Sequence, residues 1–93
     1  MYASVVDIQF QPGKMEEAIG IVNREDLGQL EGLQQFHIMD RGDDRALVVA
    51  IYDTEQQQTA AGPIAQQLLG RMASLMAAPP NREGCEVIVH EAF

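Results

Sequence analysis

Apolar side chains recur at every second residue in four segments of the chain, and this alternation predicts four β-strands. The first strand is expected over 2–10 and the last over 85–93, after a loop over 77–84 that contains Pro79-Pro80. Two more are expected within 31–53, on either side of a Gly-Asp-Asp turn at 42–44, because these residues tolerate a positive φ or bond their own backbone.

A period of 3.6 residues predicts helices in two other segments. The first helix is expected over 14–27, with Gly28 as its end. The second is expected to begin after Thr54, because Gln57 three residues later completes a capping box. The pair Gly62-Pro63 interrupts this helix, so we expect a short helix before the pair and a main helix that begins at the proline.

The predicted order of elements is β-α-β-β-α-β, within one domain that spans residues 1–93. This order is the signature of the ferredoxin-like split βαβ fold. It is an α+β architecture in which two helices cover one face of a four-stranded antiparallel sheet. The sequence therefore predicts a two-layer protein with one sheet face left without helices.

The third predicted strand is apolar on both of its faces, which is typical of a strand that is covered on both sides. We expect the face opposite the helices to carry the following residues: Val5, His37, Met39, Val48, Ala50, Tyr52, Ile88 and His90. Soluble monomers rarely expose so large an apolar patch. We therefore expect a second copy of the chain to cover this face in a symmetric homodimer.

The charge of the chain narrows the classes of partner. It has 14 acidic and 6 basic side chains and a net charge of −8, which disfavours binding to nucleic acid or to an anionic membrane. No apolar run approaches the roughly 20 residues of a membrane span. The first residues lack the basic and apolar regions of a signal peptide, so we expect a cytoplasmic protein. The single cysteine, Cys85, excludes a disulfide or a multi-cysteine metal site within one chain.

Three motifs carry a resemblance to a known family. Pro12-Gly13-Lys14 ends the first predicted strand just ahead of acidic residues, and Glu31-Gly32-Leu33 opens the second. The run Leu-Val-Val-Ala-Ile-Tyr-Asp-Thr-Glu at 47–55 passes from a strand into a helix. Over nearly its whole length, the chain resembles the dimeric α/β-barrel superfamily and, within it, the antibiotic-biosynthesis-monooxygenase-like domains.

The resemblance implies two sheets packed face to face in a dimer, with a pocket between each sheet and its own helices. Some members of the family oxidise phenolic polyketides with molecular oxygen and no cofactor, and others cleave haem. The haem-cleaving branch relies on a Trp, Asn and His set, whereas this chain has no Trp and carries its asparagines, Asn23 and Asn81, in a predicted helix and loop. The implied function is a monooxygenase-like oxidation of a small aromatic or polyketide-like molecule, without a cofactor or a metal.

Five side chains are the candidates for a site. His37 is the preferred catalytic base, because an imidazole titrates near neutrality, and Tyr52 would orient a substrate oxygen. Asp7, Met39 and His90 are candidates for the lining of a ligand pocket. Each could equally be an ordinary strand or interface residue, and no metal-ligand spacing is evident. A non-catalytic dimer that binds a small apolar or aromatic ligand, or another protein, is therefore the alternative function.

Overall fold

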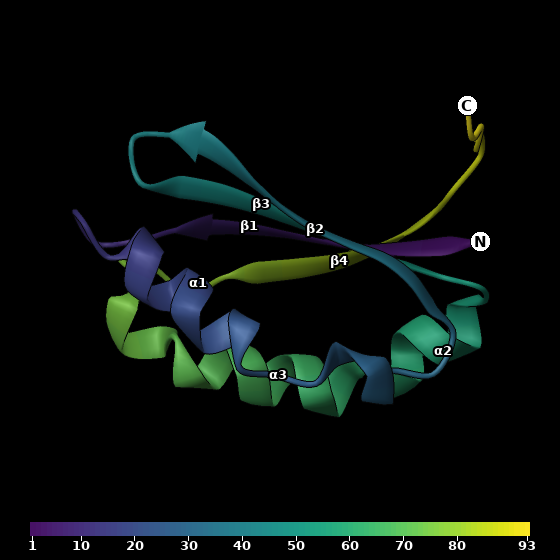
Figure 1. The fold of residues 1–93 in the computed structure, drawn as a ribbon, viewed down its shortest axis with the longest axis horizontal. Helices are drawn as coiled ribbons and strands as arrows, with labels where there is room; N and C mark the ends of the chain where they lie inside the picture. The colour runs from purple at the N-terminus through teal and green to yellow at the C-terminus, as the bar shows by residue number, and fades with distance from the viewer.

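The computed structural model describes residues 1–93 as a four-stranded antiparallel sheet with its helices on one face (Figure 1). The strand order is β2-β3-β1-β4, which confirms the predicted α+β ferredoxin-like fold. The elements in chain order are β1 (Tyr2–Gln9), α1 (Met15–Asn23), η1 (Leu27–Gln29), β2 (Leu33–Gly42), β3 (Arg45–Tyr52), α2 (Glu55–Ala60), α3 (Gly62–Arg71), η2 (Ala73–Leu75) and β4 (Asn81–Glu86), where η marks a short 3₁₀ helix. No helix is both long enough and apolar enough to cross a membrane.

The β2–β3 hairpin turns within the predicted stretch 42–44, through a loop of two residues, because Gly42 is the last residue of β2. Asp43 and Asp44 have φ angles of 55° and 61°, and a type I′ turn requires a positive φ at both central residues. The turn is also fastened to the end of β1, because the backbone N–H of Phe10 donates to the carbonyl oxygen of Asp44 at 2.8 Å. The Oδ1 atom of Asp44 accepts a further bond from the backbone N–H of Gly13 at 3.1 Å. These bonds hold the hairpin tip against the loop that leads into α1.

Helix α1 ends four residues before the predicted end at Leu27, so this part of the prediction was wrong. The backbone leaves the helix at Arg24, and Asp26 is extended and caps the new turn η1 with its side chain, which accepts from the N–H of Gly28 at 3.0 Å. An aspartate that captures a backbone N–H two residues later competes with helix continuation. The segment 25–30 is therefore a separate short stretch that lies beside the helices.

The second helical region follows the prediction. The Oγ1 atom of Thr54 accepts from the N–H of Gln57 at 3.1 Å and caps α2. The helix stops at Ala60, and Pro63 lies in the first turn of α3, where a missing N–H costs nothing. Gly62-Pro63 thus divides this region into a short helix and a longer one.

The last strand is shifted relative to the prediction over 85–93, which was wrong. Strand β4 pairs with β1 from Asn81 opposite Asp7 to Glu86 opposite Tyr2. One further bond, from the N–H of Val87 to the carbonyl oxygen of Met1 at 3.1 Å, ends the ladder. The segment 87–93, called the arm below, lies past the end of β1 and has no strand beside it. It extends away from the sheet on the side opposite the helices (Figure 1).

The register of β3 decides which side chains face the helices. Val48 is paired with Val6 of β1 and Ile38 of β2, and directly paired residues share a face of a sheet. Since Val6 belongs to the core under the helices, Val48 also faces the helices, and Ala50 and Tyr52 follow it. The prediction that these three residues lie on the uncovered face was wrong.

The side chains of the opposite face, called the outer face below, come from all four strands. The outer face includes Val5, Asp7, His37, Met39, Leu47, Val49, Ile51 and Cys85. The main core lies under the other, inner face, where Val6, Ile8 and Phe10 pack against α1 and the end of α3. Both faces of β3 are thus apolar, as predicted, but with the opposite residues on each.

Helix α2 is seated on the loop before β2 through a glycine. The backbone N–H of Asp53 donates to the carbonyl oxygen of Gly32 at 2.9 Å, and the side chain of Gln57 packs directly over the Gly32 Cα. A Cβ at Gly32 would collide with the Gln57 amide. Gly32 also has a φ of 80°, which disfavours any other residue.

We predict that Gly32→Ala lowers the free energy of unfolding by more than Gly13→Ala. Both glycines have a positive φ, so each substitution costs about 1–2 kcal/mol of backbone strain. Gly13 has open space around its Cα, whereas an alanine at position 32 must also displace Gln57. Urea denaturation measures the free energy of unfolding of each variant. When Gln57 is also replaced by alanine, Gly32→Ala and Gly13→Ala should lower that free energy by the same amount. Equal costs in the unmodified chain would show that the Gln57 contact contributes nothing.

Candidate functional site

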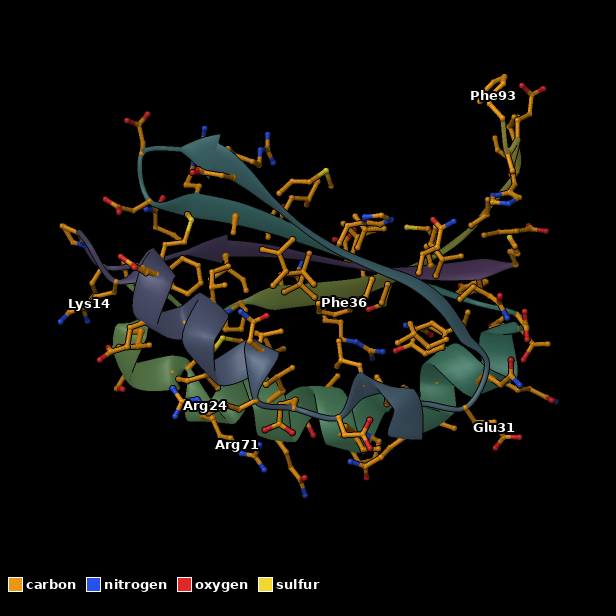
Figure 2. The ribbon with its side chains drawn as sticks, in the orientation of Figure 1. Lys14, Arg24, Glu31, Phe36, Arg71 and Phe93 are labelled. Atoms are coloured by element: carbon orange, nitrogen blue, oxygen red, sulfur yellow. The ribbon has the colours of Figure 1, made fainter.

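An apolar cavity of about 80 Å³ lies between the inner face of the sheet and the helices. Of the 24 residues that line it, 19 are hydrophobic. The lining residues come mainly from the four strands on one side and from α1, the segment 25–30 and α3 on the other. Phe36 of β2 lies at the centre of this layer, between the sheet and the helices (Figure 2). The cavity suits an apolar molecule better than a polar one.

Polar groups converge on this cavity from three neighbouring strands. Tyr52 of β3, Ser4 of β1 and Arg82 of β4 all line it, and Tyr52 and Ser4 are almost completely buried. The strand registers place Ser4 opposite Ala50 and Arg82 opposite Val6. Since Val6, Ala50 and Tyr52 face the helices, Ser4 and Arg82 also point toward the helices and the cavity. The cavity therefore combines apolar walls with a small polar group.

Burial raises the pKa of the Tyr52 phenol above its usual value, and the nearby Arg82 guanidinium partly opposes this shift. The phenol is therefore neutral at physiological pH and can donate its proton in a hydrogen bond. The guanidinium is held in place from α2, because its Nη2 atom donates to the carbonyl oxygen of Gln58 at 3.1 Å. Tyr52 and Arg82 thus supply a neutral donor and a cationic donor to the same cavity.

The two carboxylates that line the cavity already have partners. Glu25 forms an ion pair with Arg71 of α3, and Asp26 caps η1. The pair between Glu25 and Arg71 links the segment after α1 to α3 on the helical side of the cavity. These groups are engaged in holding the wall of the cavity, so Tyr52, Arg82, Ser4 and Gln29 are its remaining polar groups.

The structure places one of the five predicted site residues in this cavity. That residue is Tyr52, whereas His37 lies on the outer face with its Nε2 atom 3.3 Å from the Oε1 atom of Gln35. The sheet separates the two side chains, so one chain does not bring the predicted pair together.

The other three predicted residues lie away from the cavity. Asp7 accepts a hydrogen bond from Arg41 at 2.9 Å on the outer face, and Met39 lies on the same face. His90 belongs to the exposed arm. No three or more His, Cys, Asp or Glu side chains gather in a group that could hold a metal ion.

Sequence reasoning missed Arg82 and Ser4. Arg82 falls within 77–84, a stretch with two prolines that was expected to be a loop, so it was not placed on a strand face. The signal that could have found it is the alternation in 81–86, where Arg82 and Gly84 share one face. Ser4 was missed because a small hydroxyl inside an apolar strand carries little pattern of its own.

No protein-family model and no curated protein sequence matches this chain. Solved structures do match it. A protein from Nitrosomonas europaea that is assigned to the antibiotic biosynthesis monooxygenases shares 19% identity, with a TM-score of 0.79 over 96% of this chain and 100% of that one.

Two further solved structures carry ligands. The ActVA-Orf6 monooxygenase of Streptomyces coelicolor, in complex with nanaomycin D, is 15% identical, with a TM-score of 0.78 over 99% of this chain and 91% of that one. A MhuD variant with two manganese protoporphyrin IX molecules per active site is 17% identical, with a TM-score of 0.75 over the whole of both chains. At such identities the likeness establishes the fold. The chain therefore has the fold of the antibiotic-biosynthesis-monooxygenase-like domain, and the resemblance in its sequence is confirmed at that level.

Proposed function

We propose that the protein binds a small aromatic or polyketide-like molecule in the inner cavity and oxidises it in a monooxygenase-like reaction without a cofactor. The observation that carries the proposal is the combination of apolar walls with the Tyr52 and Arg82 donors. The fold shared with the monooxygenase from Streptomyces coelicolor supports the reaction class.

The donors favour a ligand with an oxygen that accepts hydrogen bonds. A neutral phenol and a guanidinium both donate, and the guanidinium adds positive charge in a largely apolar environment. A phenolate, enolate or quinone oxygen would satisfy both groups, while the ring would lie against the apolar walls. The same pair would stabilise negative charge that develops on the oxygen when a ring proton is removed.

The size of the cavity limits the ligand. Its volume of about 80 Å³ is smaller than the cavity of about 150 Å³ that accommodates benzene in another protein. A ring must therefore displace part of the helical wall when it binds. The segment 25–30 and α3 are the natural parts to move, because Gly62-Pro63 already interrupts the backbone ladder between α2 and α3.

The reaction needs molecular oxygen as its second substrate. Removal of a proton from an activated ring methylene leaves a carbanion, which reduces oxygen. One oxygen atom becomes a ring carbonyl, the other leaves as water, and the methylene loses both of its hydrogens. Tyr52 and Arg82 would hold the neighbouring oxygen of the ring while this charge develops.

His37 was predicted as the base, but it opens onto the outer face, where it cannot reach the cavity of its own chain. Unchanged oxygen uptake by His37→Ala would contradict its catalytic role. A porphyrin does not fit as a cofactor, because the cavity is far too small and no histidine or cysteine lines it.

The alternative function is binding without catalysis. Its supporting observation is that both histidines lie outside the cavity, and that the raised pKa of Tyr52 keeps its phenol protonated, so it cannot accept a proton as a base. Oxygen uptake with a panel of quinols and anthrones separates the two functions. Saturable binding without uptake would favour a binding or interaction protein.

We also propose that the protein is a homodimer formed through the outer face. Val5, Leu47, Val49 and Ile51 form an apolar strip across its two central strands, and the neighbouring Met39 is 43% exposed. Water against such a strip is unfavourable, and a self-complementary contact around a twofold axis removes it. The cavity lies on the other side of the sheet and stays open to ligand in this arrangement.

We predict that Tyr52→Phe removes a tyrosine whose ionisation midpoint lies above the ordinary value of about 10. The chain has two tyrosines and no tryptophan, so the difference in ultraviolet absorbance between the two proteins isolates Tyr52. Because the folded pKa lies above the unfolded one, the folded state loses stability as the pH rises past about 10. Tyr52→Phe should lessen that loss. A Tyr52 curve with a midpoint below 10 would contradict the neutral-donor role.

We predict that Arg82→Met weakens binding of ionised 2-hydroxy-1,4-naphthoquinone by about 10- to 100-fold, which is the usual value of a hydrogen bond to a charged group. Binding of uncharged 1,4-naphthoquinone should weaken less. Arg24→Met is the matched control, because Arg24 bonds the carbonyl oxygen of Gly20 and does not line the cavity. Isothermal titration calorimetry measures the dissociation constant of the ligand for the unmodified protein and for each variant. An equal loss of affinity in Arg82→Met and Arg24→Met would reject the assigned site.

We predict that Val49→Asp converts the dimer to a monomer in sedimentation equilibrium at micromolar concentration. Val49 lies at the centre of the outer face, paired with Val5 and His37, and a buried unpaired carboxylate there is costly. Gln67→Asp on the exposed surface of α3 is the control and should leave the dimer intact. A stable monomer in the unmodified protein would defeat the homodimer proposal itself.

A further inference from the structure

The arm, residues 87–93, presents apolar side chains to solvent. Ile88 and Val89 are 87% and 75% exposed, and Phe93 is fully exposed. Apart from the bond of Val87 to Met1, no backbone hydrogen bond fixes the arm to the body of the chain. Large apolar side chains that gather on such a segment mark a surface that docks on something else.

The direction of the arm indicates what it docks on. It leaves the sheet on the side of the outer face, and Phe93 lies well away from the helices (Figures 1 and 2). A second copy seated on the outer face would therefore meet the arm. By twofold symmetry, the arm of that copy would meet the first chain in the same way. The two arms would then make identical contacts, and the assembly would stop at two chains.

The area of the outer face supports the same partner. Four strands about 4.8 Å apart, each about eight residues long, cover roughly 500 Å². A stable interface buries about 800 Å² on each partner. The sheet face alone falls short of this area, and an arm with three exposed apolar side chains supplies contact beyond it.

The reach and charge of the arm indicate where it would lie. Seven extended residues span about 23 Å, enough to cross the four strands of a neighbouring sheet. The arm begins at the sheet end where Tyr52 and Glu86 flank Tyr2, and the hairpin is at the other end. Arg45 of the outer face lies at the hairpin end without an ion pair, and Glu91 of the arm would complement it.

We propose that each arm packs across the hairpin end of the outer face of a second copy, so that the two arms clasp the dimer. This inference rests on the proposed homodimer. Ile88, Val89 and Phe93 bury their apolar surface against the partner, and Glu91 lies near the partner's Arg45. Glu91 does not reach Arg45 of its own chain, because Arg45 lies seven residues, about 23 Å, along the sheet from the point where the arm begins, whereas Glu91 is five residues, about 17 Å, past Glu86.

Mixed disulfide cross-linking tests the position of the arm. One protein carries Cys85→Ser and Phe93→Cys, and a second, of different mass, carries Cys85→Ser and Met39→Cys. Met39 lies in the hairpin half of the outer face, so oxidation of the mixture should join the two different chains. Gln67→Cys on α3 replaces Met39→Cys in the control and should not cross-link. A mixture that sediments as a dimer and forms no Phe93→Cys to Met39→Cys link overturns the proposed position.

Removal of the arm tests its contribution. A chain that ends at Glu86 should dimerise with a dissociation constant at least tenfold higher, and so should the full chain with Ile88→Ser, Val89→Ser and Phe93→Ser. The second variant keeps the chain length and separates lost contact from any loss of folding. If both variants dimerise with an unchanged dissociation constant, the proposed role of the arm is wrong and the homodimer proposal still holds. If the unmodified protein is a monomer, both proposals are wrong.

Discussion

The pairing of β3 between β1 and β2 is the constraint on which the rest of the structure depends. Val48 opposite Val6 and Ile38 turns one set of side chains toward the helices and the next set away from them. A slip of one residue would exchange the two faces. Leu47, Val49 and Ile51 would then fill the cavity, and Tyr52 would leave it. The polar group of the cavity and the apolar outer face are thus two results of one register.

Much of the fold could be predicted because local chemistry determined it. The Gly-Asp-Asp turn, the Thr54 cap and the break at Gly62-Pro63 all follow from backbone preferences of the residues themselves. The predictions that were wrong concern long-range competition. Asp26 ended α1 early by capping the next turn, and β4 took its position from the partner strand rather than from its own most apolar residues.

The candidate site was less accessible from the sequence than the fold. Both faces of β3 are apolar, so alternation could not tell which of them the helices cover, and Tyr52 was assigned to the wrong face. Its polar neighbour Arg82 comes from a strand that was expected to be a loop. Only the register across three strands places Tyr52, Ser4 and Arg82 in one cavity.

The position of β1 in the sheet has a consequence for synthesis on the ribosome. This first strand is flanked by β3 and β4, so one of its edges must wait for the last strand of the sheet. The hairpin and its pairing with β1 can form once residue 52 has emerged, but the β1 ladder is incomplete until residue 86 follows. During that interval the nascent chain exposes an unpaired strand edge, which is the kind of surface that chaperones protect.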